Sequence, residues 1–294
     1  TEDSVALPPG QRPLLTMVLR KLLASSSMAI AGALRRIIAR VEEETGLGPT
    51  ADTKHESGPF LNDFEAGSDL QEELTDLPQA HTGTALVQVT AQSKAKAELQ
   101  VLRNLADRAE RIARNTKSEA LLLALRAALH LAGQKGAANK AVVFTESRRT
   151  QNYLRQVVEA AGYSVVCISG QGNDPASRQI YRDWLVRHAN DGTISGVRNA
   201  DLRAALVEHF RDHATVLLAT EAAAEGVNLQ FCSLVVNYDL PWNPQRVEQR
   251  IGRCHRYGQQ HDVVVVNFLN ERNEADRRVL ELLTDKFLLF EGVF

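Results

Sequence analysis

The sequence predicts an α/β fold, a doubly wound parallel sheet preceded by a helical extension. After Lys140, short runs of continuously apolar, largely β-branched residues suit strands that are buried on both faces, as in a parallel sheet. Segments with helical spacing separate these runs, and such alternation is typical of doubly wound domains. The chain has 294 residues, 44% of them hydrophobic and 24% charged, which is enough to bury a large core.

The predicted strands occupy residues 141–145, 165–168, 216–220, 234–238 and 263–267. The predicted helices that separate or follow them occupy residues 148–161, 176–188, 201–213, 243–256 and 273–290. Ligands of such sheets bind beside the carboxyl ends of the strands. That edge carries Thr145, Ser169-Gly170, Thr220 and Asp239, so we expect the functional site there.

The chain before the predicted sheet has a different texture. From about residue 14 to residue 41 the apolar spacing predicts two helices, because Ser25-Ser26-Ser27 offer N-cap hydroxyls between them. Residues from about 42 to 80 are rich in Asp and Glu as far as Asp76, which predicts a solvated, partly disordered insertion. Mimicry of a nucleic acid by these carboxylates is an alternative. We therefore predict a helical linker or protrusion at 1–139 and the α/β domain at 140–294.

Charge and cysteine content exclude several classes of protein. The formal net charge is −2, so any nucleic-acid contact must come from a local basic surface. Cys167, Cys232 and Cys254 lie far apart without metal-ligand spacing, which predicts reduced thiols and no metal site. No apolar run reaches the roughly 18–20 residues of a membrane span, so we expect no membrane partner. Thr1 is no natural start, and we expect a fragment of a longer cytoplasmic protein.

The segment from Asp239 to Gln259 is the most informative part of the chain. Asn243 is a natural N-cap, and Pro244 suits the first helical position. At about 100° per residue, Gln249, Arg253 and Arg256 share one stripe of the predicted helix, which we expect to stop near Gly258. An amide and two guanidiniums on one face suit an anionic phosphate. The alternative is that these arginines only complement the helix dipole.

This segment resembles motif VI of the superfamily-two helicases and translocases. Its Trp-Asn-Pro-Gln start and Arg-Cys-His-Arg-Tyr-Gly-Gln end are similar to the Swi/Snf branch. The resemblance implies a RecA-like lobe in which Gln249, Arg253 and Arg256 are catalytic, the two arginines being fingers that reach the γ-phosphate of ATP. A planar fork of donors stabilises the charge that develops during phosphoryl transfer, and such a finger is worth roughly 10³–10⁵ in rate.

Residues 220–229, directly after a predicted strand, resemble motif V of the same family. The resemblance implies that Thr220 contacts a nucleic-acid phosphate and that Gly226 and Asn228 lie against the nucleotide, together with Arg250 of motif VI. Glu221 and Glu225 stand where the family commonly has an arginine and an apolar residue, a departure that bears on the local DNA contacts. The alternative is an ordinary strand-to-helix turn that Thr220 caps.

Residues 142–146 resemble motif IV, which implies a contact between Thr145 and the nucleic-acid backbone. Ser169-Gly170, after the next strand, is where the family commonly places a second backbone contact. A turn in the core explains each of these positions equally well. The stretch from Asn173 to Asn199 is longer than usual and is interpreted as an insertion specific to this branch.

The sequence lacks a GxxxxGK[ST] phosphate loop and a DExH-like acidic motif; Gly133-Gln-Lys-Gly136 does not have the required spacing. We therefore expect ATP and Mg²⁺ to be held mainly by an N-terminal RecA-like partner lobe, and this chain alone to be inactive. Similarity to RapA-like bacterial ATPases implies an ATP-dependent helicase or translocase in the cytoplasm, associated with the nucleoid. Double-stranded DNA is the expected partner, and a larger protein complex is a further candidate. The alternatives are a strand-separating helicase lobe and a non-catalytic RecA-like scaffold.

Overall fold

The computed structural model describes residues 12–47, 88–169, 174–220, 226–270, 276–278 and 280–283. It divides the chain into two compact units, Thr1–Asn115 and Thr116–Phe294. The predicted boundary lies between residues 139 and 140. Helix α5 (Thr116–Gln134) accounts for the difference, because it buries Leu121, Leu125 and Leu129 and packs against elements of the second unit.

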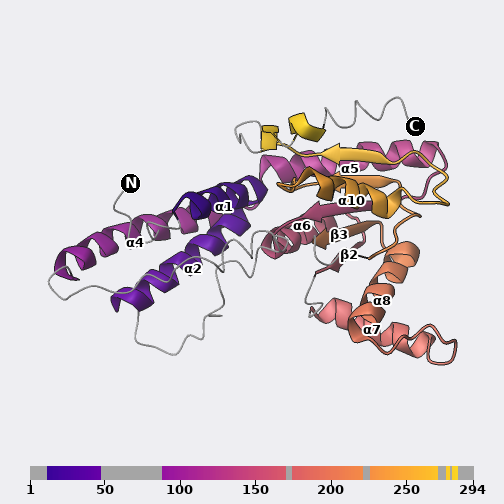
Figure 1. Ribbon diagram of the computed structural model, residues 1–294, viewed down its shortest axis with the longest axis horizontal. Helices are drawn as coiled ribbons and strands as arrows, with labels where there is room; N and C mark the ends of the chain where they lie inside the picture. The colour runs from indigo at the N-terminus through magenta and orange to yellow at the C-terminus, as the bar shows by residue number, and fades with distance from the viewer. Residues whose placement is uncertain are drawn as a thin grey trace. The chain divides into compact units, whose positions relative to one another are not determined.

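In its described part, the first unit consists of α1 (Arg12–Ser25), α2 (Ser27–Thr45) and α4 (Gln88–Glu110) (Figure 1). Ser26 has an extended backbone, and its hydroxyl accepts a hydrogen bond from the Ala29 amide at 3.0 Å. The prediction of two helices separated by a serine cap is therefore confirmed. Helix α2 packs along α4, and Arg35 of α2 donates two hydrogen bonds to the Glu110 carboxylate, at 2.9 and 2.8 Å.

The acidic residues at the end of α2 are helical. The helix continues to Thr45 and ends at Gly46, whose φ of 64° allows it to cap the last turn. Glu42 pairs with Arg103 of α4. The prediction that the disordered insertion begins at Glu42 is therefore wrong, because tertiary packing of α2 against α4 extends the helix. Residues 48–80, the remainder of that predicted insertion, lie outside the described residues.

Five parallel strands form one sheet in the described part of the second unit. They are β1 (Ala141–Thr145), β2 (Val165–Ile168), β3 (Val216–Thr220), β4 (Leu234–Asn237) and β5 (Val264–Asn267), in the order β2-β3-β1-β4-β5. The helices are α6 (Arg148–Ala160), α7 (Pro175–Arg187), α8 (Arg198–His213) and α10 (Pro244–Cys254). The doubly wound parallel sheet is confirmed. Of the helix predicted at 273–290, only 276–278 and 280–283 are described, and these residues are helical.

Helices cover both faces of the sheet, as the fully buried strands β1, β3 and β4 require. On one face, Leu202, Leu206 and Phe210 of α8 pack against side chains of β1, β2, β3 and β4 in a core cluster that also contains Cys254 of α10. On the other face, α6 contacts β1, β2 and β3, and α5 packs against α6 and β4 (Figure 1). No described helix is both long enough and apolar enough to cross a bilayer.

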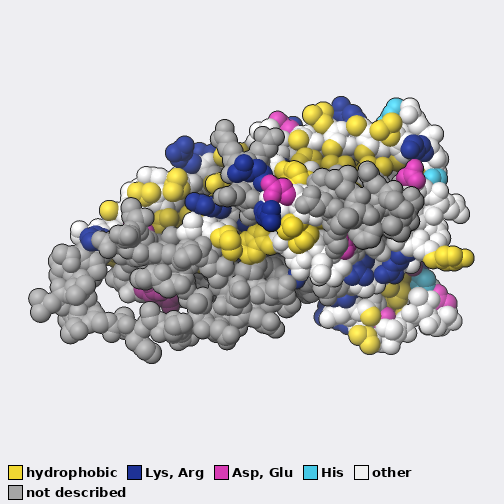
Figure 2. Space-filling model, turned by 45° about the horizontal axis from the view of Figure 1, so that its top comes forward, with side chains coloured by type: hydrophobic (Ala, Val, Ile, Leu, Met, Phe, Trp, Pro, Cys, Tyr) yellow, Lys and Arg dark blue, Asp and Glu magenta, His cyan; other side chains and the backbone are white. Residues whose placement is uncertain are grey.

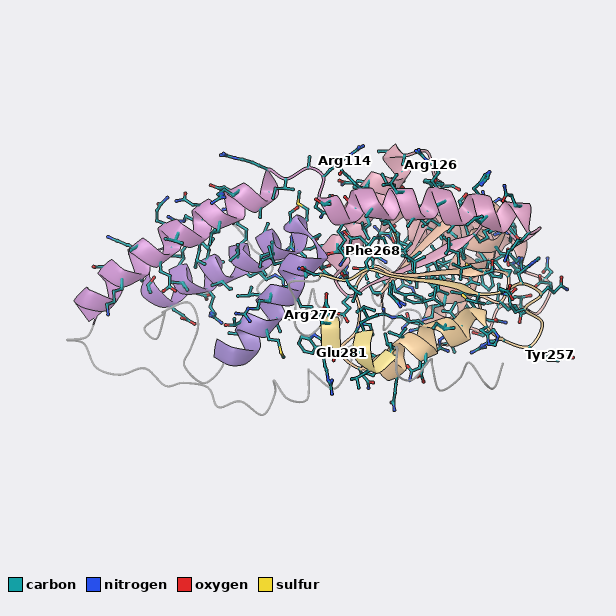
Figure 3. All side chains as sticks on the ribbon, turned by 90° about the horizontal axis from the view of Figure 1, so that it is seen from above. Arg114, Arg126, Tyr257, Phe268, Arg277 and Glu281 are labelled. Atoms are coloured by element: carbon teal, nitrogen blue, oxygen red, sulfur yellow. The ribbon has the colours of Figure 1, made fainter. Side chains whose placement is uncertain are left out.

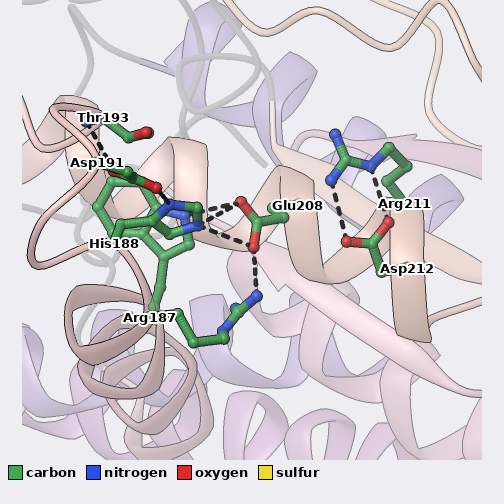
Figure 4. Close-up of polar contacts among 8 residues, drawn as sticks. Arg187, His188, Asp191, Thr193, Glu208, Arg211 and Asp212 are labelled. Carbon is green, nitrogen blue, oxygen red and sulfur yellow. Dashed lines mark hydrogen bonds and ion pairs between the residues drawn. The ribbon is translucent and has the colours of Figure 1, made fainter.

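Helices α7 and α8 form a hairpin that a cluster of polar side chains ties together (Figure 4). The Glu208 carboxylate accepts a hydrogen bond from the indole N–H of Trp184 at 3.0 Å and pairs with Arg187. The imidazole of His188 lies between two carboxylates, with Nε2 3.0 Å from Glu208 Oε2 and Nδ1 bonded to Asp191. The stretch interpreted as an insertion therefore contains α7 and is fixed to α8.

The strand order locates the switch point of the sheet. From β1 the chain moves through α6 towards β2, whereas from β4 it moves through α10 towards β5, in the opposite direction. Because parallel crossovers are right-handed, α6 and α10 lie on opposite faces and separate beyond the carboxyl ends of β1 and β4. Ligands of open α/β sheets bind at such a point.

Candidate functional site

Helix α10 begins as the sequence predicts. The Asn243 side chain accepts a hydrogen bond from the Gln245 amide at 2.9 Å, and Pro244 occupies the first helical position. Val247 is fully buried and packs with Leu240 in an apolar cluster that fixes the helix to the domain. The cap and the apolar face therefore determine which side of α10 is presented to solvent.

The end of α10 differs from the prediction. The helix stops at Cys254, and Arg256 follows it, with Nε donating to the Gly252 carbonyl at 3.0 Å. The prediction that the helix continues to Arg256 and stops near Gly258 is wrong. The helix ends earlier because the Arg253 carbonyl accepts a hydrogen bond from the Leu229 amide, outside the helix, at 2.9 Å. Gly258 instead supplies a turn, with φ of 100°.

The arginines of α10 point in two directions. Gln249 is exposed and Arg253 half-buried, and Arg256 beyond the helix is exposed. Arg250 is only 2% exposed: its Nη1 donates to Asn237 Oδ1 at 3.0 Å and to the Asp239 carbonyl at 2.9 Å. These contacts give Arg250 a structural role inside the domain, where a contact with the nucleotide was predicted. The signal was available, because positions 247, 250 and 254 recur at helical spacing and all three are buried.

The switch point between β1 and β4 is filled by the side chain of Asp239. Its Oδ2 accepts hydrogen bonds from the Thr145 hydroxyl at 2.6 Å and from the Glu146 amide at 3.2 Å. Its Oδ1 lies 3.0 Å from Nζ of Lys117, which also sits 4.3 Å from the centre of the Tyr238 ring. Sequence reasoning missed Lys117, because nothing near it in the sequence indicates a partner 122 residues away.

The hydroxyl groups predicted to contact a nucleic-acid phosphate are mostly shielded. Thr145 and Thr220 are register partners on β1 and β3, and both are fully buried. The Thr145 hydroxyl donates its proton to Asp239, so the structure has an internal hydrogen bond where a phosphate contact was predicted. Ser169 is half-buried, and Gly170 lies outside the described residues.

A buried glutamine joins the end of β2 to the middle of β3. Gln151 of α6 donates to the carbonyls of Ile168 and Leu218, each at 2.9 Å. This residue was also missed, although a polar side chain on the apolar face of a strongly amphipathic helix is a usable signal. Gln151 thus joins β2 to β3, and Asp239 joins the chain after β4 to the end of β1.

The turn after β3 brings its predicted residues next to α10. Gly226 is exposed and has a φ of 78°, a conformation that glycine adopts with less strain than other residues. Asn228 is exposed between Val227 and Leu229, which are both buried in the core cluster. Since Leu229 donates to the Arg253 carbonyl, Asn228 and the finger candidate lie on adjoining segments. Glu221 and Glu225 lie outside the described residues.

The donor set fits an anion. Arg253 and Arg256 offer guanidinium N–H groups, and Asn228 and Gln249 offer side-chain amides. Among the described residues, no group of three or more His, Cys, Asp or Glu side chains is arranged to hold a metal ion. Guanidinium and amide donors supply charge stabilisation and hydrogen bonding.

Comparison with known proteins relates the second unit to a protein family. Residues 116–258 match the helicase conserved C-terminal domain. The chain is 40% identical over 155 residues to an uncharacterized ATP-dependent helicase, YqhH, of Bacillus subtilis, which covers 53% of this chain and 23% of the relative. It is 46% identical over 76 residues to the RNA polymerase-associated protein RapA of Serratia proteamaculans, which covers 26% of this chain and 8% of that protein. The chain thus spans less than a quarter of either relative.

Solved structures that align with this chain include part of an ATPase domain and an RNA helicase. The C-terminal part of the Fun30 ATPase domain aligns with a TM-score of 0.43 and 13% identity, covering 94% of this chain and 85% of that one. The RNA helicase Prp28 from Chaetomium thermophilum bound to ADP aligns with a TM-score of 0.37 and 21% identity, covering 57% of this chain and 34% of that one.

Proposed function

Because residues 116–258 match the helicase conserved C-terminal domain, we propose that the second unit is the C-terminal motor lobe of an ATP-dependent nucleic-acid translocase of the Swi/Snf type. Its task is to complete an ATP site whose phosphate loop and magnesium ligands belong to another RecA-like lobe. We place the protein in the bacterial cytoplasm, acting on the DNA of the nucleoid. Double-stranded DNA is its proposed track.

One observation carries this proposal: the hydrogen bond between the Leu229 amide and the Arg253 carbonyl at 2.9 Å. It joins the segment of Gly226 and Asn228 to the end of α10, so that residues expected at the nucleotide and residues expected as fingers lie on adjoining segments of the chain. A scaffold without catalytic function has no need for this juxtaposition. Its presence supports an active lobe over the scaffold alternative.

The proposed chemistry follows from the guanidinium and amide donors of these segments. Arg253 and Arg256 would donate N–H groups to the equatorial oxygens of the γ-phosphoryl group, where negative charge grows as the bond to the leaving group breaks. Asn228 would orient the nucleotide, and Gln249 would hold the attacking water beside the arginines. The ATP-bound metal would add charge neutralisation from the other lobe. The arginines act only when the two lobes close, which couples hydrolysis to movement along DNA.

The decisive experiment uses the full-length protein and DNA-stimulated ATP hydrolysis. Arg253→Ala and Arg256→Ala should each lower kcat by about 10³-fold or more while KM for ATP and the Kd for DNA change much less. Arg211→Ala is the matched control, because Arg211 is an exposed arginine of α8 that pairs with Asp212. Losses of tenfold or less in both finger variants would remove the assignment.

Translocation and strand separation are distinguished with two substrates. A translocase on duplex DNA should displace a third strand from a triplex in an ATP-dependent reaction while leaving the duplex paired. Release of single strands from a plain duplex at a comparable rate would instead support the strand-separating helicase.

A further inference from the structure

Gln259 follows the finger segment and makes an unusual set of contacts. Its side-chain Nε2 donates to the carbonyls of Gln230 at 2.9 Å, Cys232 at 3.2 Å and Cys254 at 3.3 Å. Its Oε1 accepts from the His261 amide at 3.1 Å. One amide group therefore serves four backbone groups from three separate stretches of chain.

The chemistry of these partners explains why an amide is needed. Three of them are carbonyl oxygens, which accept only, and the fourth is an N–H, which donates only. A carboxylate at the same position would place an oxygen against three oxygens, and an apolar side chain would leave the backbone groups without this partner. The same partners fix the orientation of the side-chain amide. A flipped group would place Oε1 against the three carbonyl oxygens and the NH₂ group against the His261 N–H.

The contacts join the two segments that form the proposed site. Gln230 and Cys232 belong to the turn that follows Asn228, while Cys254 is the last residue of α10. Asn228 itself accepts from the Gln230 amide at 3.3 Å, so the Gln259 side chain and Asn228 hold the same short turn. Leu229, Cys232 and Cys254 are buried in the core cluster, which gives this turn a rigid base.

The loop between α10 and Gln259 is closed on itself. The backbone N–H of Gln259 donates to the Arg256 carbonyl at 2.9 Å, and Gly258 makes the turn with its positive φ. As a result Arg256 and Tyr257 form a projecting tip, and the Tyr257 side chain is fully exposed (Figure 3). The position of this tip relative to the turn at Asn228 depends on what fixes Gln259.

We propose that Gln259 is a positioning residue for the proposed ATPase site: its amide holds the Arg256 loop against the turn that carries Asn228. The inference rests on the proposed function and deepens it. Gln259 does not touch ATP. It sets the direction from which Arg256 enters the site, and a displacement of about 1 Å at a catalytic group is enough to cost on the order of 10²-fold in rate.

The test uses the full-length protein with DNA and compares Gln259→Glu and Gln259→Met with Gln260→Glu, a change at the exposed neighbour. Gln259→Glu should lower kcat on the order of 10²-fold, with KM for ATP and the Kd for DNA within about threefold of wild type. Gln259→Met removes the amide without adding a charge, so it tests the same residue even if Gln259→Glu fails to fold. It should also lower kcat with little change in KM. Gln260→Glu should retain full activity.

The double variant separates positioning from general stability. If Gln259 acts through Arg256, then Gln259→Met combined with Arg256→Ala should be no slower than Arg256→Ala alone. Multiplied losses would overturn the proposal, as would full activity of both Gln259 variants. Should Arg256→Ala keep wild-type kcat, the finger assignment falls and the positioning role falls with it. A large loss in Arg256→Ala with none at Gln259 removes the positioning role alone.

Discussion

Lys117 and Asp239 are 122 residues apart in sequence, and their charged groups meet with Nζ 3.0 Å from Oδ1. Lys117 is the second residue of α5, and Asp239 follows β4 at the switch point of the sheet. The same carboxylate receives the Thr145 hydroxyl and the Glu146 amide from the end of β1. The pair therefore joins a helix on one face of the sheet to the edge where a ligand would be expected.

We predict that this pair is energetically coupled. Side-chain exposure is 19% for Lys117 and 5% for Asp239, so removing the ammonium leaves a largely buried carboxylate without its cation. Lys117→Met should destabilise the chain by about 1–3 kcal/mol. In a double-mutant cycle with Asp239→Asn, measured by urea unfolding, the coupling should reach about 1 kcal/mol or more.

The pair Lys135–Asp262 provides the control for this cycle. Its groups are 3.8 Å apart, with side chains 71% and 92% exposed. Screening by solvent and salt should reduce its coupling to about 0–0.5 kcal/mol. Equal coupling energies for the two pairs would show that burial of Asp239 has no consequence.

Removal of the Arg250 side chain should destabilise the domain rather than impair nucleotide binding. Arg250 donates to Asn237 Oδ1 and to the Asp239 carbonyl, and its guanidinium lies 5.0 Å from the centre of the Phe144 ring. Arg250→Met leaves both acceptors without this donor, with an expected loss of about 2–4 kcal/mol in unfolding free energy. Thermal and urea unfolding of the isolated chain measure it.

The exposed neighbour Gln245 supplies the reference for that measurement. Gln245→Ala, on the same helix, should stay within about 0.5 kcal/mol of wild type. An Arg250→Met variant as stable as Gln245→Ala would mean that the buried hydrogen bonds of Arg250 contribute nothing.

The α7–α8 hairpin should respond to pH through His188. Hydrogen bonds to Asp191 and Glu208 raise the pKa of His188 above its ordinary value, and the Thr193 amide together with His188 lowers the pKa of Asp191 to about 2. A raised histidine pKa means that the folded state binds the proton more tightly than the unfolded state. The stabilisation is therefore complete below the ordinary pKa of about 6.5 and is lost as pH rises through the raised value.

His188→Gln tests this direction. The melting temperature of the variant should fall furthest below that of wild type at about pH 6, and the gap should narrow towards about pH 9. His130→Gln, at an exposed histidine of α5, should show no such trend. A gap of constant size across this range would remove the protonated histidine from the account.

The fold could be predicted because its signals are local. Continuous apolar runs marked all five strands to within one residue, and the Ser26 cap and the Asn243-Pro244 start marked two helix beginnings. The C-terminal ends of the helices were harder to predict from the sequence. The end of α2 depends on Arg103 and the end of α10 on the Leu229 amide, and both partners lie far away in sequence.

The candidate site was predicted in kind rather than in detail. The pattern of motif VI indicated which residues carry guanidinium groups, but a motif does not say which of them face inward. Arg250 and Thr145 turned out to be internal because Asp239 and Asn237 accept their hydrogen bonds, which is a tertiary fact. Lys117 and Gln259 were missed for the same reason, since their partners come from several stretches of chain.

Binding of DNA by the isolated chain should be weak and sensitive to salt. The net charge is −2, and Lys and Arg side chains on the face shown in Figure 2 are interspersed with hydrophobic, acidic and neutral ones. Few phosphates can then be neutralised at once, so we expect a Kd of about 10⁻⁴–10⁻⁶ M. Two duplexes of equal length and different sequence should bind alike, because contacts to the backbone carry no sequence code.

A fluorescence-anisotropy titration at several salt concentrations measures both properties. The slope of log K against log salt should correspond to only a few released counterions, at about 0.9 per phosphate contacted. The shielding of Thr145 and Thr220 points the same way, since these hydroxyls add little to the contact surface. Tight, salt-insensitive and sequence-selective binding would mean that base edges are read. The chain would then be a specific DNA-binding module, and the translocase proposal would fail.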